Sequence, residues 1–307
     1  MPIDYDSYMK ECTLCPRNCH ANRLEGKRGC CGQTARLQAG RAALHFWEEP
    51  CISGEKGSGT VFFSGCVLRC LFCQNRTIAE SRAGKEISVE RLAEVFLKLQ
   101  EKGANNINLV TPTHFVPQIA AALERAKTGG LSIPVVYNTG SYEKVETLRI
   151  MDGLVDIYLP DLKYASPRLG ERYSNAPDYF PVASAAIAEM VRQVGDPVLE
   201  EGPDGQELMK KGVIVRHLLL PGCGADSRRV LQYLHETYGD SIFISIMNQY
   251  TPMGEFVDYP ELNRRITSRE YDRIVDYALQ IGVEKGFIQE GDTAEESFIP
   301  AFDGEGL

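Results

Sequence analysis

The chain has 307 residues, of which 43% are apolar and 24% are charged, and its formal net charge is −9. This length fits one large domain with a small appendage, and the negative charge weighs against broad contact with nucleic acid, which requires a basic surface. No run of about 18 apolar residues occurs, so the sequence predicts no membrane span. The first residues lack an apolar signal stretch. Ten cysteines in such a chain indicate metal sites in a reducing compartment, and we expect a cytoplasmic protein.

Strand-like and helix-like segments alternate from residue 60 onward. Expected strands cover residues 60–64, 106–110, 134–137, 156–159, 213–220 and 242–247. Expected helices cover residues 87–103, 115–127, 142–151, part of 166–195, 227–238, and a last helix that begins at the capping box of Thr267 and Glu270 and ends at Gly282. The polar insert 195–212 is predicted to be a surface loop.

These segments divide the chain into three parts: a cysteine-rich metal-binding segment (1–50), a set of βα units (51–290) and a C-terminal tail (291–307). Apolar strands that alternate with helices predict a parallel α/β sheet buried on both faces. The periodicity alone fits a partial barrel and an open doubly wound sheet equally well. In both folds, ligands bind at the C-terminal ends of the strands.

Three cysteines, Cys66, Cys70 and Cys73, follow the first expected strand in the run GCVLRCLFCQN. A loop with this C-x3-C-x2-C spacing can place three thiolates round one corner of an iron–sulfur cube. A [4Fe–4S] cluster normally takes four cysteines, so three of them leave one iron open to a non-protein ligand. A zinc loop or a set of buried thiols is the alternative, although zinc at this spacing usually takes a fourth Cys or His close by.

This loop, with Phe72 just before its last cysteine, resembles the signature of radical S-adenosylmethionine (SAM) enzymes. The surrounding run ISGEKGSGTVFFSGCVLRCLFCQN is similar to a largely uncharacterised branch related to pyruvate formate-lyase activating enzyme. The resemblance implies a partial (β/α)6 TIM-like barrel over residues 51–290, in which SAM chelates the open iron. It also implies reductive cleavage of SAM to a 5′-deoxyadenosyl radical, which abstracts hydrogen from a substrate.

Partners follow from the same resemblance. The reaction requires a one-electron donor such as flavodoxin or ferredoxin. A glycine of a glycyl-radical enzyme is the substrate that this branch suggests, while other proteins, peptides or small molecules stay open. The alternative from a different class is a non-enzymatic iron–sulfur or zinc-binding protein, and formation of 5′-deoxyadenosine distinguishes the two.

Polar residues just past the second and third expected strands are candidates for the SAM pocket. Thr113 and His114 stand where many relatives carry a Gly-Gly-Glu motif, which this chain lacks. Asn138 and Thr139 resemble a Thr-Asn-Gly turn that relatives place near SAM. A turn selected for its backbone shape is the alternative.

Asp161 and Lys163 follow the fourth expected strand and resemble the Asp-x-Lys of glycyl-radical activating enzymes. Residues two apart in an extended segment point the same way, so Lys163 can neutralise the SAM carboxylate while Asp161 orients it or binds a substrate backbone. The alternative is an internal ion pair.

Further candidates lie on the later strands and on the cysteine loop. Arg216 and its neighbour His217 face opposite ways, and the resemblance favours Arg216 as the residue that enters the barrel. Gln249 and Tyr250 follow the last expected strand, and either could touch SAM or substrate. Phe72 is expected near the adenine.

A second group of cysteines, Cys12, Cys15, Cys19 and Cys31, lies in the N-terminal segment. Four thiolates complete either a structural zinc site or a second [4Fe–4S] cluster, and the spacing does not decide between them. A Gly-x-Cys-Gly pattern shared with the family favours Cys31 over Cys30. Cys51 and Cys223 lack partners in sequence and are expected to be ordinary buried or pocket-edge residues.

Overall fold

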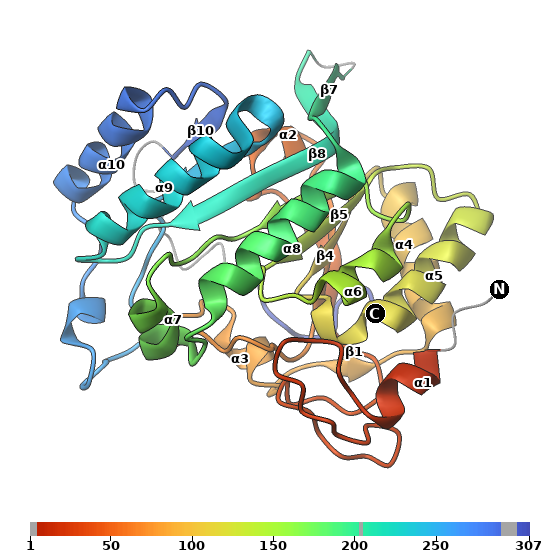
Figure 1. The fold of residues 1–307 in the computed structure, drawn as a ribbon. Coiled ribbons are helices and arrows are strands. Elements are labelled where there is room, and N and C mark those ends of the chain that lie inside the picture. Colours follow the sequence, from red (N-terminus) through yellow and green to blue (C-terminus); the bar gives the residue numbers. More distant parts are fainter. Residues whose placement is uncertain (1–4, 203–204, 290–299) are drawn as a thin grey trace.

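Parallel strands form the centre of the computed structural model, which describes residues 5–202, 205–289 and 300–307 (Figure 1). The strands are ordered β10-β9-β8-β6-β5-β4-β2-β1-β3, and the sheet does not close into a full barrel. The parallel members are β2 (Ser58–Phe63), β4 (Ile107–Val110), β5 (Val135–Thr139), β6 (Ile157–Pro160), β8 (Glu207–Leu218), β9 (Phe243–Met247) and β10 (Gly286–Ile288). The expected parallel α/β architecture is confirmed.

Three further strands run antiparallel to their neighbours. They are β1 (Gln38–His45) beside β2, β3 (Lys85–Glu86) beside β1, and β7 (Val198–Glu201) beside β8. Near β1 runs the end of the chain, where the Ala42 amide donates to the Glu305 carbonyl at 2.8 Å. The expected tail, 291–307, lies outside the described residues as far as residue 299.

The longer helices, among them α4, α5, α8 and α9, cover the outer face of the sheet (Figure 1). The helices of the described residues are α1 (Tyr5–Lys10), α2 (Pro50–Ser53), α3 (Arg76–Ala79), α4 (Val89–Glu101), α5 (Val116–Thr128), α6 (Val145–Leu148), α7 (Pro167–Ser174), α8 (Tyr179–Val194), α9 (Gly224–Tyr238) and α10 (Ser268–Gln280). The expected capping box of Thr267 and Glu270 forms at the start of α10, and Ser88 caps α4. No helix in the described parts of the chain is long and apolar enough to span a membrane.

Side chains that point into the half-barrel are apolar at one end and polar at the other. An apolar cluster from α2 and the strands fills the end where the strands begin: Cys51, Ile52, Val136, Ile157, Leu159, Met209 and Ile214. Cys51 is thus an ordinary buried residue. This end is packed, and a cavity lies at the other end, where the parallel strands finish.

Several sequence-based boundaries were wrong. The polar insert 195–212 is a hairpin of β7 and the first half of β8 rather than a loop. Its side chains are largely exposed, so no buried face imposes an apolar alternation on the sequence. The segment 166–195 holds two helices, because Asn175 adopts a left-handed conformation (φ +48°) and ends α7. The expected helix 142–151 is shortened to α6 and a 3-10 turn, η2 (Arg149–Met151).

Candidate active site

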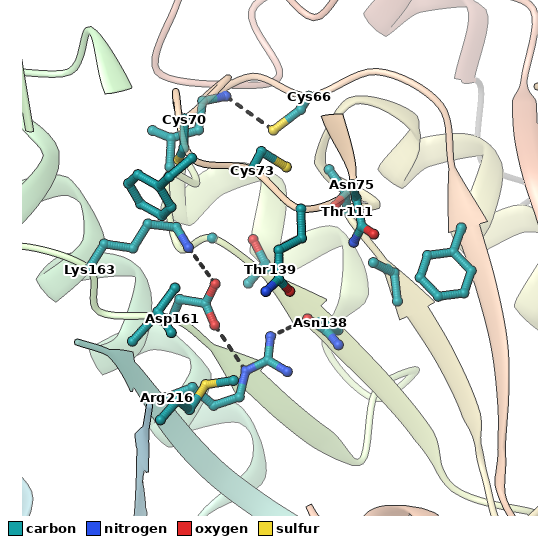
Figure 2. A pocket seen from close by; sticks show the side chains of 18 of the residues that line it. Cys66, Cys70, Cys73, Asn75, Thr111, Asn138, Thr139, Asp161, Lys163 and Arg216 are labelled. Carbon is teal, nitrogen blue, oxygen red and sulfur yellow. Dashed lines mark hydrogen bonds and ion pairs between the residues drawn. The ribbon is translucent and has the colours of Figure 1, made fainter. Parts of the chain in front are cut away.

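The C-x3-C-x2-C motif lies on the loop that follows β2, at the edge of the sheet where the parallel strands end (Figure 2). Gly65 begins this loop with a φ of +88°, in the left-handed region that favours glycine. The Leu71 amide donates to the Tyr173 carbonyl at 2.9 Å, which ties the loop to α7. All three cysteines of the motif line one cavity.

Hydrogen-bond donors point at these sulfur atoms. The Leu68 amide donates to Cys66 Sγ at 3.4 Å, and the Ser174 hydroxyl donates to Cys70 Sγ at 3.0 Å. Burial raises the pKa of Cys70, and burial with the neighbouring Cys66 and Cys70 thiols raises the pKa of Cys73 to about 12. A metal cation reverses this effect, because a coordinating thiol is deprotonated. The donor set therefore fits three thiolate ligands of an iron–sulfur cluster.

In the part of the chain that the structure describes, no group of three or more His, Cys, Asp or Glu side chains is already arranged to hold a metal ion. This holds for the loop cysteines and for the N-terminal cysteines alike. A thiol can be redirected by rotation about χ1, so this arrangement does not exclude either group as a set of ligands.

The cavity has a volume of about 260 Å³ and combines sulfur, charged and aromatic groups. The loop cysteines lie on one side, and a row of charged and amide side chains lies across from them (Figure 2). Residues that line it include Cys66, Cys70, Phe72, Cys73, Thr113, Asn138, Thr139, Asp161, Lys163, Arg216 and Gln249, together with His45, Trp47, Glu48 and Pro300. The strand-end candidates other than His114 and Tyr250 thus meet in one place.

Asp161 holds two cations at the floor of the cavity (Figure 2). Lys163 Nζ lies 2.6 Å from Asp161 Oδ2, and Arg216 Nε lies 2.9 Å from Asp161 Oδ1. Arg216 also donates to Asn138 Oδ1 at 2.6 Å. The expected alternative of an internal ion pair is therefore present, and it orients both cations.

The two cations stay charged despite their burial. Burial alone would lower the pKa of Lys163, but the negative charge of Asp161 and the Cys70 sulfur raise it above its usual value. Burial also opposes the charge of Arg216, while Asp161, Glu49 and Glu48 raise its pKa. For Asp161, burial raises the pKa, and Lys163 and Arg216 outweigh that effect and lower it. The cavity floor is an ionised network near neutral pH.

Glu48 completes this network and was missed by the sequence reasoning. Its carboxylate lies 3.0 Å from Arg216 NH1 and accepts hydrogen bonds from Asn108 and Asn138, each at 3.1 Å. Glu49, next to it, is buried, and burial raises its pKa. The only available signal was two adjacent acidic residues in the run HFWEEP, upstream of the first expected strand.

Glu143 is a second buried carboxyl that the sequence reasoning missed. The hydroxyls of Thr113 and Thr139 both donate to its Oε1, at 2.6 and 2.5 Å. Burial raises the pKa of Glu143. The two threonines line the cavity, yet their hydroxyls are directed to Glu143, so they fix the shape of the strand ends.

The two histidines beside the candidate residues point elsewhere. His114 Nε2 contacts the Ser64 carbonyl at 2.6 Å, beneath the cysteine loop, and burial lowers the pKa of His114 to about 3. His217 Nδ1 contacts the Leu162 carbonyl at 2.7 Å. Arg216, one residue earlier, enters the cavity, as residues on opposite faces of a strand must.

Aromatic residues surround Phe72. Its ring meets those of Tyr164, Tyr173 and Tyr250 edge-on at centroid distances of 6.2 to 6.5 Å. Tyr250 donates its hydroxyl to the Leu262 carbonyl and packs behind Phe72 rather than in the cavity. Gln249 lines the cavity, and its carbonyl accepts from Gln74 at 2.9 Å.

Residues 60–198 match the family model described as the Radical SAM superfamily. This stretch of the chain is a radical SAM domain. The matched segment contains the cysteine loop and the strand ends at Asn138, Asp161 and Lys163, while Arg216 and Gln249 lie beyond it. This superfamily implies a [4Fe–4S] cluster and SAM, which the thiol donor set and the charged cavity floor fit.

Three known proteins are similar to this chain in sequence or in structure. An uncharacterised protein of Methanocaldococcus jannaschii, MJ0674, is 28% identical over 280 residues, covering 88% of this chain and 74% of the relative. Pyruvate formate-lyase 1-activating enzyme of Escherichia coli is 52% identical over 31 residues, which is 10% of this chain and 13% of that enzyme. The structure of Streptococcus suis SuiB bound to precursor peptide SuiA gives a TM-score of 0.50 at 15% identity, over 74% of this chain and 46% of SuiB. The chain thus spans about half of SuiB, and this likeness supports the fold.

Proposed function

We propose that this chain is a radical SAM enzyme whose Cys66, Cys70 and Cys73 hold the [4Fe–4S] cluster. When bound, the cluster supplies one electron to SAM, which splits into methionine and a 5′-deoxyadenosyl radical that abstracts hydrogen from a substrate. The observation that supports this function is the shared cavity: three thiols face an ionised Asp161–Lys163–Arg216 network across it.

The chain's own residues bind and orient SAM in this proposal. Lys163 neutralises the SAM carboxylate, and Asp161 keeps the Lys163 ammonium charged and directed into the cavity. Asn138 and Thr139 shape the wall, and Phe72 and Gln249 lie where the adenine would pack. Arg216 links Asp161 to Glu48, which also lines the cavity.

For the substrate we infer a polypeptide, with a glycine of a glycyl-radical enzyme as the first candidate. The short 52% identical match to pyruvate formate-lyase 1-activating enzyme supports this class. Other peptides, proteins and small molecules are the competing substrates. Flavodoxin or ferredoxin is the one-electron donor that this chemistry requires.

The test is anaerobic reconstitution with iron and sulfide, followed by incubation with dithionite and SAM. We expect 5′-deoxyadenosine and methionine in equal amounts, and loss of both in Cys70→Ala. Cys51→Ala is the matched control, because Cys51 lies in the apolar cluster at the opposite end of the strands. No 5′-deoxyadenosine from a chain whose loop cluster is loaded, as shown by about four irons that Cys70→Ala loses, would refute the enzyme and favour a non-enzymatic iron–sulfur protein.

A further inference from the structure

The N-terminal segment folds around a group of cysteine sulfurs that the proposed reaction does not use. Cys12, Cys15 and Cys31 are buried. Two of the sulfurs lie on either side of Gly29. A Cβ at Gly29 would lie 3.3 Å from Cys19 Sγ and 3.4 Å from Cys31 Sγ, so these two sulfurs are close to each other. The chain also turns back on itself, because the Cys12 amide donates to the Ala21 carbonyl and the His20 amide to the Cys12 carbonyl. The N-terminal segment thus brings the sulfurs of Cys12, Cys15 and Cys19 near that of Cys31.

Backbone amides near three of these sulfurs favour the thiolate form. The amide two residues downstream acts to lower the pKa of each thiol, against the effect of burial on it: Arg17 for Cys15, Ala21 for Cys19 and Gln33 for Cys31. The radical SAM loop is similar, because the Leu68 amide donates to Cys66 Sγ at 3.4 Å and the Asn75 backbone acts to lower the pKa of Cys73. Amide donors stabilise thiolates and tune the metals that thiolates bind. Both cysteine groups therefore share the backbone arrangement of thiolate ligands.

A buried arginine lies against the same sulfurs. Arg23 is 1% exposed and donates to the carbonyls of Thr34 and His114 and to Cys12 Sγ at 3.7 Å. None of these acceptors is charged unless Cys12 is a thiolate. A buried cation is costly without an anion nearby. A site of four thiolates around one metal carries net negative charge and supplies that partner.

From these contacts we propose that Cys12, Cys15, Cys19 and Cys31 form a second metal site, in which four thiolates bind one zinc ion or one [4Fe–4S] cluster. Cys30 is exposed and stays outside the site. The segment has few large apolar side chains, so metal binding contributes directly to its fold. None of the four ligands lines the cavity, so the existence of this site does not rest on the proposed reaction.

Through Arg17 the second site also supports the radical SAM loop. Arg17 lies between Cys15 and Cys19, and its guanidinium donates to the carbonyls of Val67 and Ser174, each at 3.0 Å. Val67 lies inside the C-x3-C motif, and Ser174 donates to Cys70 Sγ. Arg17 is therefore a positioning residue: a metal that orders its turn also orders the loop that binds the first cluster.

Metal analysis of the anaerobically purified full chain tests the site. Cys15→Ser and Cys31→Ser should each lose one zinc, or about four irons, per chain relative to the wild type. Cys30→Ser, one residue from Cys31, should retain the full complement. Metal content in Cys15→Ser and Cys31→Ser equal to that of the wild type would overturn the proposal.

A second measurement does not depend on how these variants fold. Cys70→Ser keeps the N-terminal cysteines and removes a ligand of the loop. X-ray absorption at the zinc or iron edge should then show sulfur-only coordination, at about 2.3 Å for zinc. Nitrogen or oxygen ligands, or no bound metal, would overturn the second site even if the first cluster forms. Failure of the radical SAM proposal would instead leave this signal intact.

Arg17→Met tests the coupling, with Arg36→Met as control because Arg36 pairs with Glu86 at the exposed surface. We expect Arg17→Met to retain the N-terminal metal and to release iron from the loop about 10- to 100-fold more readily to a chelator, with an altered electron paramagnetic resonance spectrum of the reduced loop cluster. Arg17→Lys keeps the positive charge but not the forked geometry of the guanidinium. It should therefore release iron from the loop nearly as readily as Arg17→Met. Unchanged iron release and spectrum in Arg17→Met would refute the coupling.

Discussion

The hydroxyl of Ser174 donates to Cys70 Sγ across 3.0 Å, and so joins the last residue of α7 to the middle cysteine of the radical SAM loop. Ser174 is buried and also contacts the Tyr164 hydroxyl at 2.9 Å. Its position is therefore set from two sides. A hydrogen bond to a ligand sulfur is one of the means by which a protein sets the reduction potential of a cluster.

Ser174→Ala should make the loop cluster harder to reduce, because the reduced form carries more negative charge and depends more on donors to its sulfurs. A hydrogen bond of about 1 kcal/mol corresponds to roughly 40 mV for a one-electron couple. Anaerobic redox titration should show a midpoint more negative by that order, with unchanged iron content. Ser132→Ala, far from the loop, is the control. An unchanged or more positive midpoint would contradict this role for Ser174.

Lys163→Met should weaken SAM binding about 10- to 100-fold, because it removes a charge-assisted contact worth roughly 1.5 to 3 kcal/mol. The fold should persist, since Asp161 keeps its ion pair with Arg216 at 2.9 Å. Isothermal titration with SAM measures the loss, and Lys98→Met on the exposed face of α4 serves as control. Equal affinity in Lys163→Met and wild type would place the SAM carboxylate elsewhere.

The residues that meet in the cavity could be predicted because one topological rule locates them. Parallel strands end at a common edge, so polar residues just past each strand, such as Asn138, Asp161 and Lys163, must come together. Glu48 follows no such rule. It precedes the first parallel strand and reaches Arg216, 168 positions later in the chain, only through the folded sheet.

Edge strands escaped prediction for a related reason. β7 and β10 are exposed on most of their residues, so burial imposes no alternating apolar pattern on them. β1 is partly buried, but it lies in the N-terminal segment, where no strand was expected. The fold of the inner strands is encoded locally, whereas the edges of the sheet depend on pairing with distant segments.

Glu143 should make stability depend on pH. Burial raises the pKa of its carboxyl above the usual 4.5, so folding favours the neutral form. Its contribution is fully present below about pH 4.5 and is lost as the pH rises through the raised pKa. Glu143→Gln, which cannot ionise, should therefore gain stability relative to the wild type as the pH rises. Urea midpoints of both proteins over this range measure the difference, and a difference independent of pH would contradict it.

Gly65→Ala should separate the N-terminal cysteine segment from the radical SAM loop. A Cβ at this position would lie 2.6 Å from the Cys31 carbonyl oxygen, a backbone atom that cannot move alone. Gly153→Ala is the matched control, because Gly153 has a similar φ of +78° with no atom within 4 Å of its Cβ position. Both variants carry the cost of a left-handed alanine, about 1 kcal/mol, and only Gly65→Ala adds the clash, a further 1 to 3 kcal/mol or so. Thermal unfolding should give Gly65→Ala a lower melting temperature than Gly153→Ala, and limited proteolysis should cut Gly65→Ala first within residues 12–34. Equal melting temperatures would show that the two segments are not packed as tightly as the contact between Cys31 and Gly65 indicates.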